Sequence, residues 1–275
     1  QLSIKATFPK FPELERKHGS VIRGMLSTNA DAAGRQSVER KRRMFVSLKK
    51  GLEDLIAALH RSLTDRGLTL RSGTAVESLR VRSHELGRWT YDVMLGGGGA
   101  LSVDGLILAT PAFVSAELLR PLTPIAGGLL ERIPYASTAT VAMAYPAAAV
   151  GQRVQGFGFV VPRVEQRDLI AATWTSLKWP HRAPADQVLV RCYLGGVGRE
   201  AVLELDDPSL IARVRAELQR ICGLVAEPTY VEVNRWVNAM PQYVLGHLER
   251  LDEIERALSR FDGLVLTGSA YRGVG

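Results

Sequence analysis

The sequence has little cysteine and no long apolar run, and each absence narrows the class of protein. Only two cysteines occur in 275 residues, Cys192 and Cys222. They are too few for a disulfide scaffold or a zinc site and are typical of a reducing compartment. No stretch of 18 apolar residues occurs, so the sequence predicts no bilayer-spanning helix. No Ser-His-Asp set or carboxylate pair stands out, and no G-x-G-x-x-G motif occurs.

The composition is that of a globular protein with a basic charge balance. Hydrophobic residues make up 46% of the chain, enough for a sizeable core in one large or two modest domains. The net charge is +7, from 35 Lys and Arg against 28 Asp and Glu. The densest basic run is Arg40–Arg43 and has no aromatic residues interleaved. We interpret it as a solvated linker or helix face, and we predict no nucleic-acid partner.

The first half of the chain has the pattern of an α/β layer. A helix is predicted from Ser47, its N-cap, to Arg66, with Gly67 after its end. Its apolar stripe consists of Leu52, Leu55, Ile56, Leu59 and Leu63. Strands are predicted over 68–70, 75–81, 89–95, 101–103 and 105–110, with a hairpin turn at 96–99. The apolar strand 105–110 breaks at Pro111 into a helix over 113–119, which is typical of a parallel sheet.

From about residue 137 the pattern changes to strands in succession, which predicts an antiparallel sheet. These strands span 138–145, 157–161, 169–175, 188–194 and 230–236. One helix interrupts them, capped by Asp207, with Pro208 at its first position and Gly223 after its end. A helix over 248–261 and a buried strand over 263–267 then resemble the first layer again. The predicted fold class is therefore α/β plus α+β, with the second layer inserted into the first.

Two segments of the sequence carry a family resemblance. Residues 236–247 read W-x-x-A-x-P-Q-Y-x-x-G-H, and residues 156–165 read G-F-G-F-V-V-P-R-V-E. Together with Leu194-Gly195-Gly196 and the N-terminal segments 6–11 and 22–25, they resemble the protoporphyrinogen oxidases in order and spacing. Trp179 departs from that pattern, which usually has Phe, and exchanges one aromatic residue for another.

The resemblance implies an amine oxidase-like fold, in which an FAD-binding doubly wound domain holds an inserted substrate domain. Residues 1–30 would end a membrane- or substrate-domain segment, 31–122 and 246–275 would belong to the FAD-binding domain, and 123–245 would form the substrate domain. The implied activity is FAD-dependent oxidation of protoporphyrinogen IX or coproporphyrinogen III by O2 in haem biosynthesis. The implied location is cytoplasmic and of bacterial type. Peripheral membrane association and a homodimer stay open.

The same resemblance assigns site residues. The residues assigned to FAD are Val76, whose backbone would meet the adenine, Trp236 beside the flavin, and the turn residues Gly273, Val274 and Gly275. Those expected to line the substrate cleft are Phe159, Trp174 and Met240. No catalytic side chain and no metal site are predicted, because flavin N5 accepts the hydride. For His247, a structural or capping role is preferred over that of a base.

The first residue is Gln1 and the last strand ends in a Gly-rich turn, so we interpret the sequence as an internal piece of a larger protein. The piece is expected to be inactive alone, because the phosphate-binding turn of the family would lie upstream. Two alternatives stay open. One is another enzyme of the flavin amine oxidase superfamily, an amine oxidase or a carotenoid desaturase. The other is a non-catalytic basic binding protein, which would bind polyanions in a salt-dependent way.

Overall fold

The chain forms two compact units, each of them built from separate stretches of sequence. The computed structural model describes residues 1–33, 47–83, 89–151, 154 and 156–273. The first unit contains the described residues of Gln1–Arg42, Thr69–Pro134 and Pro241–Gly275, and the second those of Arg43–Leu68 and Tyr135–Met240. The basic run Arg40–Arg43 lies outside the described residues. Which unit carries which function is still a prediction.

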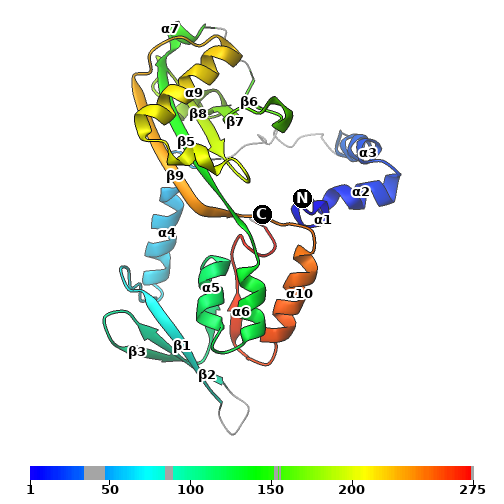
Figure 1. Cartoon of the computed structure of the whole chain (residues 1–275), viewed down its shortest axis with the longest axis vertical. Coiled ribbons are helices and arrows are strands. Elements are labelled where there is room, and N and C mark those ends of the chain that lie inside the picture. The colour runs from blue at the N-terminus through cyan, green and yellow to red at the C-terminus, as the bar shows by residue number, and fades with distance from the viewer. Residues whose placement is uncertain (34–46, 84–88, 152–153, 155, 274–275) are drawn as a thin grey trace. The chain divides into compact units, whose positions relative to one another are not determined.

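The first unit begins with three helices and continues into a small antiparallel sheet (Figure 1). The helices are α1 (Ile4–Thr7), α2 (Lys10–His18) and α3 (Val21–Ala33). The sheet consists of β1 (Val76–Ser83), β2 (Trp89–Leu95) and β3 (Ala100–Val103), in that order. Alternation buries Tyr91 and Val93 on β2, and the Leu95 N–H donates to the Gly99 carbonyl at 3.0 Å. The predicted hairpin is therefore confirmed.

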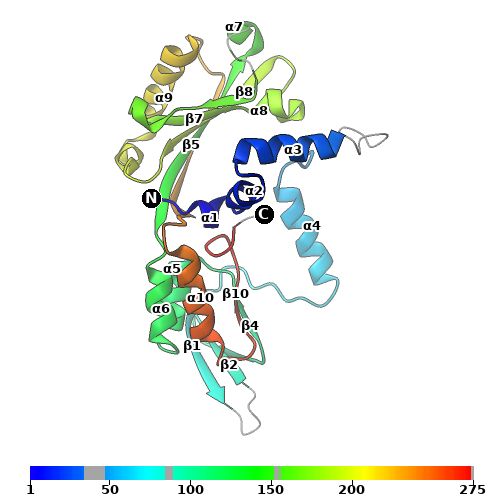
Figure 2. The same ribbon diagram turned by 90° about the vertical axis from the view of Figure 1, so that its right-hand side faces the viewer.

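A parallel strand pair and three helices complete the first unit. β4 (Leu106–Leu108) pairs in parallel with β10 (Leu264–Leu266), residue for residue, although more than 150 positions separate them. α5 (Ala112–Leu119) packs on α6 (Pro124–Glu131), which packs on α10 (His247–Leu258) (Figure 2). The parallel pair confirms the α/β prediction, because such strands need a long crossover. Here the crossover contains the larger part of the second unit, Tyr135–Met240.

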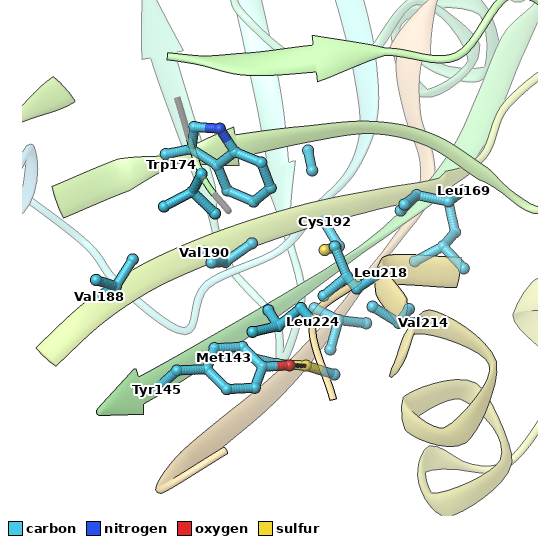
Figure 3. Packing of buried hydrophobic residues seen from close by; sticks show 14 of the residues in the cluster. Met143, Tyr145, Leu169, Trp174, Val188, Val190, Cys192, Val214, Leu218 and Leu224 are labelled. Atoms are coloured by element: carbon cyan, nitrogen blue, oxygen red, sulfur yellow. Dashed lines mark hydrogen bonds between the residues drawn. The ribbon is translucent and has the colours of Figure 1, made fainter. Parts of the chain in front are cut away.

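The second unit is a five-stranded sheet with a helix packed on it. The strand order is β6 (Gly158–Val160), β7 (Leu169–Trp174), β8 (Gln187–Gly195), β5 (Tyr135–Pro146) and β9 (Tyr230–Pro241). β6–β7, β7–β8 and β5–β8 are antiparallel, as predicted. Leu210, Val214 and Leu218 of α9 (Asp207–Cys222) join the strand side chains in one apolar core (Figure 3). The shorter helices of this unit are α4 (Glu53–Thr64), α7 (Ala147–Val150) and α8 (Thr175–Lys178).

Three predicted details of these elements are wrong. The helix predicted from Ser47 starts at Glu53, and Ser47 instead accepts a hydrogen bond from Arg182 Nη2 at 2.5 Å. Residues 68–70 form no strand, because the Leu68 N–H turns back to the Leu63 carbonyl at the end of α4. The cap of α9 is Asp206, whose carboxylate accepts from the Ser209 N–H at 2.9 Å.

The described residues contain neither a helix that could span a membrane nor a cluster of metal ligands. No helix in this part of the chain combines the length and the apolar character needed to cross a bilayer. Within the same residues, no three His, Cys, Asp or Glu side chains come together as metal ligands would.

Candidate functional site

The turn Gly268–Gly273 follows β10. Of the three residues 273–275 that are predicted to face the flavin, Gly273 is the one that the structure describes, and it ends this turn. Its first bond continues the strand pairing, since the Thr267 N–H donates to the Leu108 carbonyl at 2.9 Å. Gly268 and Gly273 have φ of 128° and 103°, which L residues with a Cβ rarely adopt. The two glycines therefore allow the chain to turn sharply directly after β10. The prediction of a buried strand here is correct only for Leu264, since Val265 is exposed. Val274 and Gly275 lie outside the described residues.

A cavity of about 850 Å³ lies along this turn. Its walls are β10, the apolar side of α10 with Leu251 and Ile254, and the turn itself, including Gly273. The volume falls within the range of cofactor and ligand pockets, and most of the wall is apolar. The cavity thus offers a concave, mainly apolar surface next to the predicted flavin-facing glycine, which is compatible with a flavin ring.

Two side chains that follow β9 contact the turn. The Tyr243 hydroxyl donates to the Ser269 carbonyl, and His247 Nε2 lies 2.9 Å from the Tyr271 carbonyl oxygen. The two rings are stacked, with centroids 4.3 Å apart and planes 16° from parallel. His247 is 1% exposed, and burial lowers the pKa of its imidazole. His247 is also the first residue of α10, with Gly246 as the N-cap.

Val76 lies at the start of β1, opposite Leu95. The register shifts between Val76 and Ser78, so the strand is irregular at this point, and the Val76 side chain is exposed. The register shift interrupts the regular ladder directly after Val76. The adenine role of Val76 is still a prediction.

Trp236 and Met240 are both exposed on β9, and Trp236 is 51% exposed. The indole Nε1–H donates to Thr140 Oγ1 of the neighbouring strand β5 at 3.3 Å, which orients the ring. Between the two residues, Asn238 adopts φ of 47° and its N–H donates to Ser137 Oγ at 2.9 Å. β9 therefore presents a large aromatic and a flexible apolar side chain on either side of a backbone irregularity. Their flavin and substrate roles are still predictions.

Phe159 and Trp174 pair with each other inside the second unit. Their rings meet edge to face, with centroids 5.6 Å apart and planes at 65°. Trp174 is only 3% exposed and belongs to the apolar core, against which Phe159 packs (Figure 3). Their surroundings within this unit are those of core residues, while contact with a substrate is still a prediction.

The predicted site residues are distributed over both units. Val76 and Gly273 belong to the first unit, whereas Phe159, Trp174, Trp236 and Met240 belong to the second. The contact of the Tyr243 hydroxyl with the turn was not predicted from the sequence. The available signal was the spacing of Tyr243 and His247, four residues apart at a strand-to-helix junction beside a glycine.

Comparison with known proteins places the chain among flavin enzymes. The sequence profile described as flavin containing amine oxidoreductase matches residues 1–274. Coproporphyrinogen III oxidase of Bacillus subtilis (strain 168) is 34% identical over 100% of this chain and 57% of its own length. The chloroplastic protoporphyrinogen oxidase of Oryza sativa subsp. japonica is 28% identical over 100% of this chain and 54% of its own length. The chain thus spans a little over half the length of these relatives.

Solved structures agree with the predicted fold class. A crystal structure from Exiguobacterium sp. 255-15, provisionally named a protoporphyrinogen oxidase, superposes with a TM-score of 0.81 at 31% identity. The superposition covers 100% of this chain and 56% of the Exiguobacterium chain. A putrescine oxidase variant covers 80% of this chain with a TM-score of 0.62 at 17% identity, which shows similarity of fold alone. The amine oxidase-like fold is confirmed.

Proposed function

The chain belongs to the flavin containing amine oxidoreductase family, and from that premise we propose that its protein oxidises a porphyrinogen to the porphyrin. The substrate is coproporphyrinogen III or protoporphyrinogen IX, the cofactor is FAD, and the place in metabolism is haem biosynthesis. The observation that carries the proposal is the match to a coproporphyrinogen III oxidase along the entire chain at 34% identity. O2 as acceptor, a cytoplasmic location of bacterial type, peripheral membrane association and a homodimer extend the same proposal.

The roles of individual residues follow from what a flavin and a porphyrinogen need. A bound flavin supplies the redox chemistry by accepting hydride, and the protein supplies placement and shielding. Gly273 allows the backbone to approach the ring closely because it has no Cβ. The Trp236 indole, held by Thr140, offers a flat apolar surface of the kind that its predicted flavin contact needs. Met240 offers an adaptable side chain to a broad macrocycle.

The number of electrons removed from the porphyrinogen determines how many molecules of the electron acceptor are needed. Conversion of a porphyrinogen to the porphyrin removes six electrons and six protons, in three two-electron steps. With O2 as the proposed acceptor, three O2 are reduced to three H2O2. Among the predicted site residues none is needed as an acid or base, because the ring nitrogens can lose protons to solvent.

The test uses the complete protein that contains this chain. Flavin absorption bands, together with porphyrin fluorescence that rises faster than in an enzyme-free control under air, are expected. Both porphyrinogens are supplied separately, and the ratio of the kcat/KM values identifies the substrate. Flavin bands without a fluorescence rise would indicate the amine oxidase or carotenoid desaturase alternative. A protein without flavin that binds polyanions in a salt-dependent way would indicate the basic binding protein.

A further inference from the structure

The segment between β9 and α10 holds the turn after β10 by two parallel contacts. Tyr243 donates its hydroxyl to the Ser269 carbonyl, and His247 reaches the Tyr271 carbonyl at 2.9 Å. The donors are four residues apart and the acceptors two residues apart, and the donor rings are stacked on each other. We call these two side chains, with their two bonds, the clasp.

The chemistry of the acceptors fixes the state of the histidine. A backbone carbonyl only accepts, so His247 Nε2 must carry the hydrogen. His247 Nδ1 is buried and has no hydrogen-bond partner among the described residues. The Arg250 and Arg272 charges oppose a second proton on the ring. The neutral Nε2–H tautomer therefore satisfies both the acceptor and the surroundings.

Holding a carbonyl also orients the next N–H group. The peptide unit is planar and trans, so the N–H of the following residue points opposite to the carbonyl. Fixing the Ser269 and Tyr271 carbonyls directs the N–H groups of Ala270 and Arg272 away from the clasp. The other side-chain tie near this point, Arg272 to Glu255, is mostly exposed and contributes little. The clasp thus adds a buried bond, from His247, and an exposed bond, from Tyr243, to the middle of the turn.

We propose that Tyr243 and His247 are positioning residues, which order the Gly268–Gly273 turn and set the orientation of its N–H groups toward the flavin. The orientation toward flavin rests on the proposed function, whereas the ordering of the turn does not. Neither side chain touches the reacting atoms in this account. The clasp also explains why Tyr and His occur together at this spacing, beside a glycine that allows the helix to start.

The first experiment measures the turn without any cofactor. Amide hydrogen exchange over 268–273 is compared in the 275-residue chain for wild type, H247F, H247Q and Y243F. H247F keeps a ring for stacking and removes the donor, whereas H247Q keeps an N–H donor. We expect about tenfold faster exchange in H247F, the factor for one buried hydrogen bond, a smaller increase in Y243F, whose bond is exposed, and near wild-type exchange in H247Q. H60F, on the exposed side of α4, is the matched control.

Unchanged exchange in both H247F and Y243F would overturn the clasp. An equal increase of the exchange rate in H247F and H247Q would also overturn it, because the packing of the side chain, and not its hydrogen-bond donor, would then hold the turn. If H247F does not fold, Y243F still decides, since it removes one oxygen atom only. Nitrogen-15 shifts of the His247 ring provide an independent check, and a protonated Nδ1 at neutral pH would contradict the assigned tautomer.

The second experiment addresses the flavin in the complete protein. H247F is expected to shift the flavin absorption bands and to lower kcat with little change in KM for the porphyrinogen, and H247Q is expected to restore both. Faster turn exchange with unchanged flavin bands would overturn the cofactor half of the proposal only. Absence of flavin in the wild-type protein would instead overturn the proposed function, while the exchange data would still decide the clasp.

Discussion

Burial makes the neutral form of His247 the stable one in the folded chain. Desolvation is the largest cause of the lowered pKa, and the nearby Arg250 and Arg272 charges act in the same direction. The Tyr271 carbonyl opposes them by accepting the ring hydrogen. The stacked Tyr243 ring excludes water without adding a charge at neutral pH. The net result is a histidine that resists protonation only while the chain is folded.

A pH dependence of stability follows for this residue. Below its ordinary pKa of 6.5 the unfolded chain binds a proton that the folded chain does not. The free energy of unfolding should therefore fall as pH decreases from about 6.5 toward the lowered folded pKa, by at most about 1.4 kcal/mol per pH unit for one proton. Denaturant unfolding at pH 7.5, 6.5 and 5.5 measures it.

The variant H247Q isolates this contribution. It cannot titrate, so the slope of unfolding free energy against pH should be smaller than in wild type over this range. H60Q, which replaces an exposed histidine of α4 by the same residue, is the matched control variant. If the free energy of unfolding depended on pH in the same way for wild type and H247Q, His247 would titrate alike in the folded and the unfolded chain, and the prediction would be wrong.

At the scale of elements, the close contact between α5 and α6 depends on one of two adjacent glycines. A Cβ on Gly127 would lie 2.9 Å from Arg120 Cα and 3.1 Å from the Ala116 carbonyl oxygen. A Cβ on Gly128, the next residue of the same helix, would meet nothing within 4 Å. Both residues are helical, so their helix propensities are the same and only their surroundings differ.

This pair gives a matched prediction. Gly128→Ala should stabilise the first unit by about 0.5–1 kcal/mol, through lower backbone entropy of the unfolded chain. Gly127→Ala should destabilise it by about 1–3 kcal/mol, because backbone atoms of α5 have to move. Denaturant unfolding of the two variants measures the difference. Equal effects of the two substitutions would mean that the helices do not approach each other as closely as described.

The same helix shows why part of the fold was not predictable. Helix α6 was not predicted from the sequence, because Pro124 and the two glycines locally resemble a turn. The helix forms since Thr123 caps it and because Gly127 permits close packing on α5, which is a tertiary property. By contrast, β2 was predicted within its observed bounds, because strict alternation buries Tyr91 and Val93 on one face.

The candidate site was predictable only where local sequence decides it. The glycine turn after β10 follows from an apolar strand that runs into residues able to adopt positive φ. The clasp does not, since its two bonds join residues 26 and 24 positions apart. Trp174 shows the reverse difficulty, because nothing in an isolated aromatic residue distinguishes a cleft wall from the core.

At the scale of the whole molecule, the exposed apolar stripe of α4 and the greater length of the relatives both indicate that further polypeptide belongs to the complete protein. The predicted stripe of α4 forms, yet all of it is exposed among the described residues, for example Leu59 at 49%. Monomeric proteins rarely leave such a contiguous apolar stripe in water. The relatives are longer, since the chain spans only 57% of the Bacillus subtilis enzyme. We therefore expect further polypeptide of the complete protein to cover this stripe.

Cofactor binding provides the last prediction, because it depends on the same further polypeptide. A dinucleotide needs a helix N-terminus and a Gly-rich turn for its pyrophosphate, and the 275 residues have no G-x-G-x-x-G motif. The turn at Gly273 and the ring of Trp236 could contact only the flavin end of FAD. We expect the 275-residue chain to retain no stoichiometric FAD after gel filtration, while the complete protein retains about one per chain, measured by visible absorption. Stoichiometric FAD on the 275-residue chain would mean that these residues hold the pyrophosphate by another arrangement, and the dependence on further polypeptide would be wrong.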